Sequence, residues 1–232
     1  MFSLADQRHH SMSIEKHNNI SSSLLVRRIE QILLRSPYPF RVGGTLPLIQ
    51  LTYSSKSISV ILDVMTKDDI VVVPEPNLRK RSQRVGVITD DIKKLIADMI
   101  AATVDWENSR DHEASVGLAA VQVNQLLRIF IVRNDYDDIS NKDFTVFVNP
   151  EIVKKIGPVE EDFEGCLSVP DIYGKVPRHQ SVKVKALNEA GESFRVTAHG
   201  FLARILQHET DHTQGVLFVD RIKDSKNAFY QM

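Results

Sequence analysis

The sequence predicts an α+β fold, in which short antiparallel or mixed β-sheets surround a central C-terminal helix that carries an HExxH motif, with a second helix nearer the N-terminus. Two segments have the apolar spacing of helices, and several shorter segments have the alternation of strands. The chain has 232 residues, of which 42% are hydrophobic and 25% are charged. This composition is typical of a globular protein and excludes wholesale disorder.

The first predicted helix covers residues 91–104, where apolar side chains recur at intervals of three and four. These side chains belong to Ile92, Leu95, Ile96, Met99, Ile100 and Val104. Thr89 or Asp90 precedes the segment and is a suitable N-cap. The second predicted helix runs from about Phe201 to Gln214, and Gly215 is a natural stop after it.

Strands are predicted where apolar and polar residues alternate or where short apolar runs stand alone. These segments are residues 127–132, 144–148, 182–186 and 194–198. The last of them follows a turn signal at Asn188–Gly191. Residues 71–73 predict a short strand or an extended segment, which Pro74 ends.

Residues 1–64 differ from the rest of the chain in charge and pattern. They hold seven basic and four acidic residues, whereas residues 65–232 hold 22 basic and 26 acidic ones. Only residues 23–34 have the periodicity of an amphipathic helix. We expect residues 1–64 to be an N-terminal extension that is poorly structured or not part of the fold, and residues 65–232 to be the catalytic domain. An organellar presequence, a small accessory element and translated upstream sequence before a start at Met65 remain alternatives.

Several classes of protein are excluded by simple counts. No stretch approaches about 18 uninterrupted apolar residues, so neither a membrane-spanning helix nor any other membrane association is expected. The first residues lack the apolar core of a signal peptide. A net charge of −1 gives no reason to expect direct reading of nucleic acid. The single cysteine, Cys166, excludes an internal disulfide and cysteine-rich zinc modules.

The segment from Gln207 to His212 carries the strongest chemical signal. Histidines four residues apart lie on one helix face, so His208 and His212 can reach the same metal ion, and Glu209 between them can accept a proton. Two buried histidines could also be ordinary core residues, so a third ligand decides between the two readings. The position of the third histidine in metzincins holds Phe218, and no glutamate follows Glu209. A third ligand, if there is one, must therefore lie upstream.

Two upstream segments have unusual local sequences. Glu164-Gly165-Cys166-Leu167-Ser168 contains the only cysteine, which could instead be a small buried hydrophobic residue. Residues 115–122, Ser-Val-Gly-Leu-Ala-Ala-Val-Gln, combine small residues with Gln122, whose amide could point into a site or out to solvent.

In this order, SVGLAAVQ, EGCLS and QHETDH resemble the motifs GxGxAAxQ, EGCLS and QHExDH of the peptide deformylase family. The resemblance extends from about Met65 to the C-terminus and includes Pro74–Arg79 and Val176–Arg178. Three motifs in the family's order are far more specific than HExxH alone. One position departs from the pattern, because Ser115 replaces its first glycine. We expect this change to alter substrate affinity and to leave the chemistry intact.

The resemblance implies a role for each motif residue. Cys166, His208 and His212 would bind one divalent metal ion, with Fe²⁺ expected and Zn²⁺, Ni²⁺ or Co²⁺ as alternatives. Glu209 would transfer the proton of the attacking water to the departing amine. The side-chain amide of Gln122 and the backbone N–H of Leu167 would stabilise the oxyanion.

The resemblance also implies how the substrate is bound. An extended peptide would lie against the backbone of Val116 and Gly117. Leu167, Phe201 and Ile205 are candidates for the wall of a hydrophobic pocket for methionine. Substrate contacts are also expected at Glu164 and Gly165.

The implied activity is removal of the N-formyl group from the N-terminal methionine of newly synthesised proteins. That substrate implies transient association with the ribosome and a bacterial cytoplasmic location, or an organellar one if residues 1–64 are a presequence. Two alternatives remain: an HExxH zinc endopeptidase, and a non-catalytic protein that binds peptide N-termini on the same fold.

Overall fold

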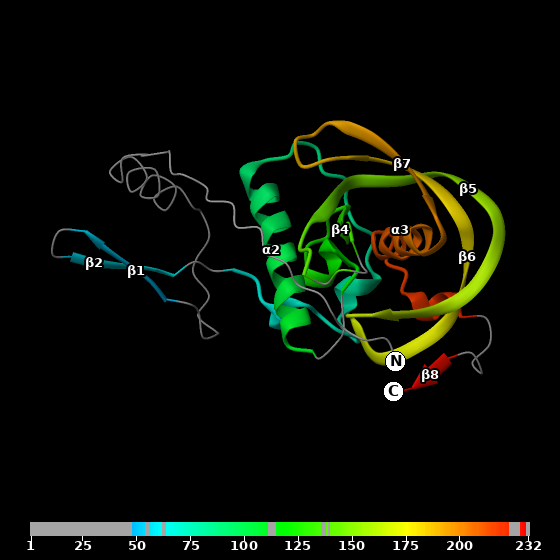
Figure 1. The fold of residues 1–232 in the computed structure, drawn as a ribbon, viewed down its shortest axis with the longest axis horizontal. Coiled ribbons are helices and arrows are strands. Elements are labelled where there is room, and N and C mark those ends of the chain that lie inside the picture. Colours follow the sequence, from blue (N-terminus) through cyan, green and yellow to red (C-terminus); the bar gives the residue numbers. More distant parts are fainter. Residues whose placement is uncertain are drawn as a thin grey trace, which may run out of the picture. The chain divides into compact units, whose positions relative to one another are not determined.

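The computed structural model describes residues 64–110, 115–135, 138 and 140–222, together with the backbone of residues 48–53, 56–61 and 228–230 (Figure 1). The chain divides into two compact units, residues 1–49 and 50–232. Strands β1 (Leu48–Tyr53) and β2 (Lys56–Ile61), which the sequence analysis did not predict, form a two-stranded sheet. The helix expected at residues 23–34 lies outside the described residues. The boundary at residue 64 stays a prediction.

One larger sheet contains six strands, with β3, β4, β5, β6 and β7 in this order and β8 paired with β6. The bounds are β3 (Gly117–Ala119), β4 (Ile129–Arg133), β5 (Phe144–Cys166), β6 (Val169–Leu187), β7 (Ser193–His199) and β8 (Ala228–Tyr230). All pairings between these strands are antiparallel. Together with the two helices, the sheet confirms the predicted α+β class.

Strands β5 and β6 are much longer than predicted, with 23 and 19 residues. The prediction of short strands at 144–148 and 182–186 was wrong in length, because the β5–β6 pairing contains four register shifts, which interrupt the alternation of side chains. The last shift, between Glu164 and Cys166, lies in the EGCLS motif. Residues 71–73 do not form a strand: Val73 begins a turn, and the N–H of Val71 donates to the carbonyl of Gln122.

Helix α2 (Asp90–Asn108) begins after Thr89, whose side chain accepts a hydrogen bond from the N–H of Ile92. The cap at Thr89 is as predicted. Leu95, Ile96, Met99 and Ala102 are buried on one face of the helix, in a core that also contains Ile129 and Ile131 of β4. This face is the apolar stripe that the sequence predicts.

Helix α3 (Gly200–His212) contributes to a second core. Its buried residues Ala203, Ile205 and Leu206 share this core with Phe130 and Val132 of β4. Because residues of β4 alternate between the two cores, α2 and α3 lie on opposite faces of this strand. The long strands β5 and β6 curve around α3 (Figure 1).

The described residues also form four short 3₁₀ helices. They are η1 (Lys67–Asp69), η2 (Pro76–Arg79), η3 (Ala120–Val123) and η4 (Phe218–Arg221). After α3, the chain turns at Gly215, where φ is +76°. No helix in the described part of the chain is long and apolar enough to cross a membrane.

Candidate functional site

The three predicted metal ligands converge. Cys166 is the last residue of β5, and His208 and His212 lie one turn apart on α3. Cys166 Sγ lies 3.3 Å from His212 Nε2, which lies 3.2 Å from His208 Nε2. The ligand atoms all lie within 4.8 Å of one another. A thiol and two imidazoles this close together are a donor set that fits a divalent transition metal.

The second nitrogens of the two histidines differ in their environment. His208 Nδ1 lies 2.9 Å from Glu164 Oε2, so a hydrogen bond fixes the ring and directs Nε2 toward the cluster. His212 Nδ1 is buried and has no hydrogen-bond partner. Burial lowers the pKa of His212 well below its ordinary value, and a neutral imidazole is the form that binds metal.

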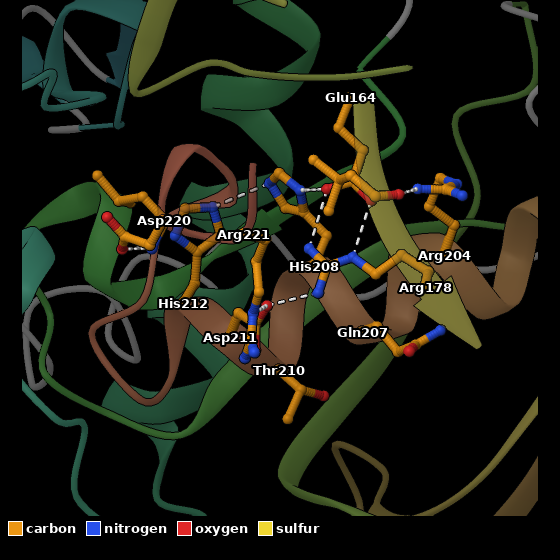
Figure 2. A network of polar contacts seen from close by, with 12 residues as sticks. Glu164, Arg178, Arg204, Gln207, His208, Thr210, Asp211, His212, Asp220 and Arg221 are labelled. Atoms are coloured by element: carbon orange, nitrogen blue, oxygen red, sulfur yellow. Dashed lines mark hydrogen bonds and ion pairs between the residues drawn. The ribbon is translucent and has the colours of Figure 1, made fainter. Parts of the chain in front are cut away.

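Glu164 is the centre of a buried polar network (Figure 2). Its carboxylate accepts hydrogen bonds from Arg178 Nε at 2.8 Å, Arg178 Nη2 at 2.9 Å and Arg204 Nη1 at 2.9 Å. Burial alone would raise the pKa of Glu164, but the hydrogen bonds with Arg178 and His208 lower it to about 2. The carboxylate is therefore ionised when it holds His208.

Asp211 extends this network to the chain after α3. It accepts hydrogen bonds from Arg178 Nη1 at 2.5 Å and from Arg221 Nη2 at 2.6 Å (Figure 2). The local sequence predicts no role for Asp211, because its two partners lie 33 and 10 residues away along the chain. The one sequence feature that could have pointed to this network is Arg178, the last residue of the Val-Pro-Arg stretch that resembles the family.

Glu209 lies on the same helix, is 4% exposed, and borders a cavity of about 390 Å³. One of its carboxylate oxygens, Oε2, is buried without a hydrogen-bond partner. Burial raises the pKa of Glu209 to about 7. A carboxylate with a pKa near neutrality and an unoccupied oxygen is suited to accept and return a proton.

Gln122, on η3, also borders the cavity and directs its amide nitrogen toward Cys166. Its Oε1 accepts the N–H of Ala119 at 2.8 Å, which fixes the orientation of the amide. Its Nε2 lies 3.1 Å from Ser168 Oγ and 3.6 Å from Cys166 Sγ. The nitrogen is thus a positioned donor beside the proposed ligand.

All of the predicted site residues except His212 line the cavity. His212 is 1% exposed and lies in the cluster without bordering the cavity. The sequence analysis missed three aromatic residues of the wall, Trp106, Phe163 and Tyr173. They come from α2, β5 and β6, and no local motif marked them.

Two backbone segments, at Gly117 and at Gly165, border the cavity that contains the candidate catalytic groups. Strand β3 is an edge strand that pairs with β4 on one side, and no other strand of the described residues pairs with its opposite edge, which borders the cavity at Gly117. On the other side, a Cβ at Gly165 would lie 2.6 Å from the Tyr173 ring. A side chain at either glycine would narrow the site.

The chain resembles known proteins in sequence and in fold. A family model described as polypeptide deformylase matches residues 67–228. The chain belongs to the peptide deformylase family. It is 40% identical to a peptide deformylase from Thermomicrobium roseum over 164 residues, which cover 69% of this chain and 89% of that relative. It is 46% identical to peptide deformylase 1 from Clostridium perfringens over 143 residues, covering 62% and 89%.

Solved peptide deformylase structures have the same fold. The crystal structure from Legionella pneumophila superposes with a TM-score of 0.61 at 38% identity, over 71% of this chain and 89% of that chain. A peptide deformylase structure from Synechococcus elongatus, in complex with actinonin, superposes with a TM-score of 0.61 at 32% identity, over 68% of this chain and 80% of that chain. The predicted family and enzyme class are thereby confirmed. Members of the peptide deformylase family use a divalent metal ion, which agrees with the Cys/His/His cluster.

Proposed function

We propose that this peptide deformylase hydrolyses the formamide bond of N-formyl-methionyl peptides and releases formate together with the free amino terminus. The observation that carries the proposal is the convergence of one thiol and two imidazoles; two of these three groups border the same cavity of about 390 Å³ as the buried carboxylate of Glu209. Such an arrangement supports water attack on a polarised carbonyl group.

Cys166, His208 and His212 would hold one divalent ion, which we take to be Fe²⁺, with Zn²⁺, Ni²⁺ or Co²⁺ as substitutes. When bound, the ion supplies Lewis acidity that activates a water molecule and polarises the formyl carbonyl. Glu164 would orient His208 through the bond to Nδ1. We therefore assign Glu164 to positioning of the ligand, because its carboxylate is already engaged by Arg178, Arg204 and His208.

Glu209 would take the proton from the attacking water and deliver it to the departing amine. Its raised pKa, about 7, suits both transfers near neutral pH. The Nε2 of Gln122 and the backbone N–H of Leu167, the residue after Cys166, would donate to the oxyanion of the tetrahedral intermediate.

The substrate would bind as an extra strand. The edge of β3 at Gly117 that does not face β4, together with Val116 just before the strand, would hydrogen-bond an extended peptide, with Gly165 on the opposite side of the cavity. Leu167, Phe201 and Ile205 would form the apolar wall against the methionine side chain. The substrate class implies translation that starts with formyl-methionine, transient ribosome contact, and a bacterial cytoplasm or an organelle as the compartment.

The direct test is hydrolysis of formyl-Met-Ala-Ser by protein purified without oxygen, with the metal content measured on the same sample. Formate release that follows the metal content supports the proposal. Casein cleavage without formate release would instead assign an endopeptidase. Loss of activity in air should be faster for iron-loaded than for nickel-loaded protein, because thiolate–iron sites oxidise readily. Equal decay would count against iron or against oxidation as the cause of the loss.

A further inference from the structure

A buried ion pair lies next to the substrate-binding edge of β3. Glu107, in the last turn of α2, and Arg133, the last residue of β4, have side chains that are 5% and 0% exposed and are in direct contact. Removing two charges from water carries a cost that their attraction does not always recover. Stability alone therefore does not explain why this pair is present.

The pair holds both backbone groups of one residue, Ser115. The N–H of Ser115 donates to Glu107 Oε1 at 2.9 Å, and Arg133 Nε donates to the carbonyl of Ser115 at 3.1 Å. The backbone N–H of Arg133 also donates to the carbonyl of Val116 at 3.0 Å. We call Glu107, Arg133 and Ser115 the Ser115 clamp. The clamp fixes the two residues that lead into Gly117.

The side chain of Ser115 adds a contact that a glycine lacks. Its Oγ donates to the carbonyl of Gly117 at 3.3 Å, and Ser115 is 4% exposed while bordering the cavity. The position at which the family pattern has glycine is therefore held here through its N–H, its carbonyl and its hydroxyl. Such a backbone loses less freedom when a peptide pairs with it.

We propose that Glu107 and Arg133 are positioning residues that preorganise the edge of β3 for the backbone of the peptide substrate. The inference rests on the proposed deformylase function and adds two residues that no motif contains. Gly117, which lies against Glu209, is held by its own pairing with Val132 of β4. Loss of the clamp should therefore affect binding of the peptide chain and leave the bond-breaking step unchanged. It should therefore change KM for peptides and leave kcat unchanged.

The test compares two substrates, formyl-Met-Ala-Ser and formyl-methionine amide, on metal-loaded enzyme. The double variant Glu107→Leu/Arg133→Met removes the clamp without leaving a buried charge unpaired. We expect its KM for the tripeptide to rise about tenfold, with kcat within about twofold and with little change for formyl-methionine amide. Thermal unfolding and metal content establish that the variant is folded and loaded.

Two further variants keep the test decisive. Arg133→Lys retains the charge opposite Glu107 but lacks the Nε contact with Ser115, so it should also raise KM for the tripeptide. This variant serves as the test if the double variant does not fold. Lys142→Met removes the other partner of the Glu107 carboxylate, at 2.8 Å, and should leave KM unchanged. An unchanged tripeptide KM in a folded, loaded clamp variant would overturn the inference. Inactivity of the wild-type enzyme toward both substrates would instead overturn the proposed function.

Discussion

Gly117 and Glu209 are in such close contact that no side chain fits between them. A Cβ at position 117 would lie 2.7 Å from Glu209 Oε1, 3.0 Å from its Cδ and 3.2 Å from its Cγ. The edge of β3 and the proposed proton carrier of α3 are therefore fitted to each other. The glycine in the middle of the SVGLAAVQ motif serves this contact and leaves room beside the cavity.

Gly117→Ala should reduce activity and preserve the fold. The added methyl group meets the end of a side chain that can move, so the melting temperature should change little, but Glu209 would leave its position. We expect kcat to fall about 10- to 100-fold with metal content unchanged, as measured by steady-state kinetics and metal analysis. Gly86→Ala is the matched control, because nothing lies within 4 Å of a Cβ at that position. Wild-type kcat in Gly117→Ala would mean that the contact is unimportant.

Glu209→Gln should stop turnover without releasing the metal. The amide has the same shape but cannot accept the proton, so kcat should fall by about 10²- to 10⁴-fold. Glu161→Gln, on the exposed part of β5, is a control that should retain full activity. A Glu209→Gln enzyme with substantial turnover would remove Glu209 from its assigned role.

Cys166→Ala should lose metal and activity together. The variant leaves only His208 and His212 within the cluster, and two imidazoles do not complete a tight site. Elemental analysis after dialysis gives the readout, with wild-type protein treated in parallel. A full metal complement in the variant would contradict the ligand assignment.

Asp211→Ala should weaken both stability and metal binding. The change leaves Arg178, whose side chain is 5% exposed, without one of its two carboxylate partners. We expect a loss of about 3 kcal/mol in the free energy of unfolding, and an affinity for metal reduced about tenfold, because Arg178 also holds Glu164 against His208. Chemical denaturation and metal titration measure these effects. The control Lys93→Met, which breaks an exposed pair with Asp90, should change neither; equal effects in the two variants would disprove the network's role.

Removal of residues 1–64 should leave hydrolysis of formyl-Met-Ala-Ser intact. Every site residue lies beyond this segment, and the family match begins at residue 67. The comparison is of kcat/KM between the full chain and residues 65–232. A large loss of activity in a folded truncated protein would make the extension part of the functional unit.

The sequence predicts best where a pattern is local. The helical spacing around Met99 and the cap at Thr89 depend on residues within a few positions, and both are seen in α2. The length of β5 was not predictable in this way, since its bulges displace residues such as Val153 and Val159 from strict alternation and leave them exposed.

The residues of the candidate site also differ in whether local sequence could predict them. His208, Glu209 and His212 lie on one helix, and Cys166 and Gln122 stand in recognisable motifs, so their convergence could be inferred. The partners of Asp211 could not be inferred, because Arg178 and Arg221 reach it only after β6 and η4 have been placed by the fold. The buried Glu107–Arg133 contact could not be predicted either, because its two residues lie 26 positions apart, on α2 and β4.

We assign the metal ion of this deformylase to Cys166, His208 and His212. The most direct measurement is formate release from formyl-Met-Ala-Ser by anaerobically purified full-length protein, with divalent metals counted per chain. We expect stoichiometric formate and Met-Ala-Ser, with close to one metal ion per active chain. A fully metal-loaded, folded protein that releases no formate would contradict it.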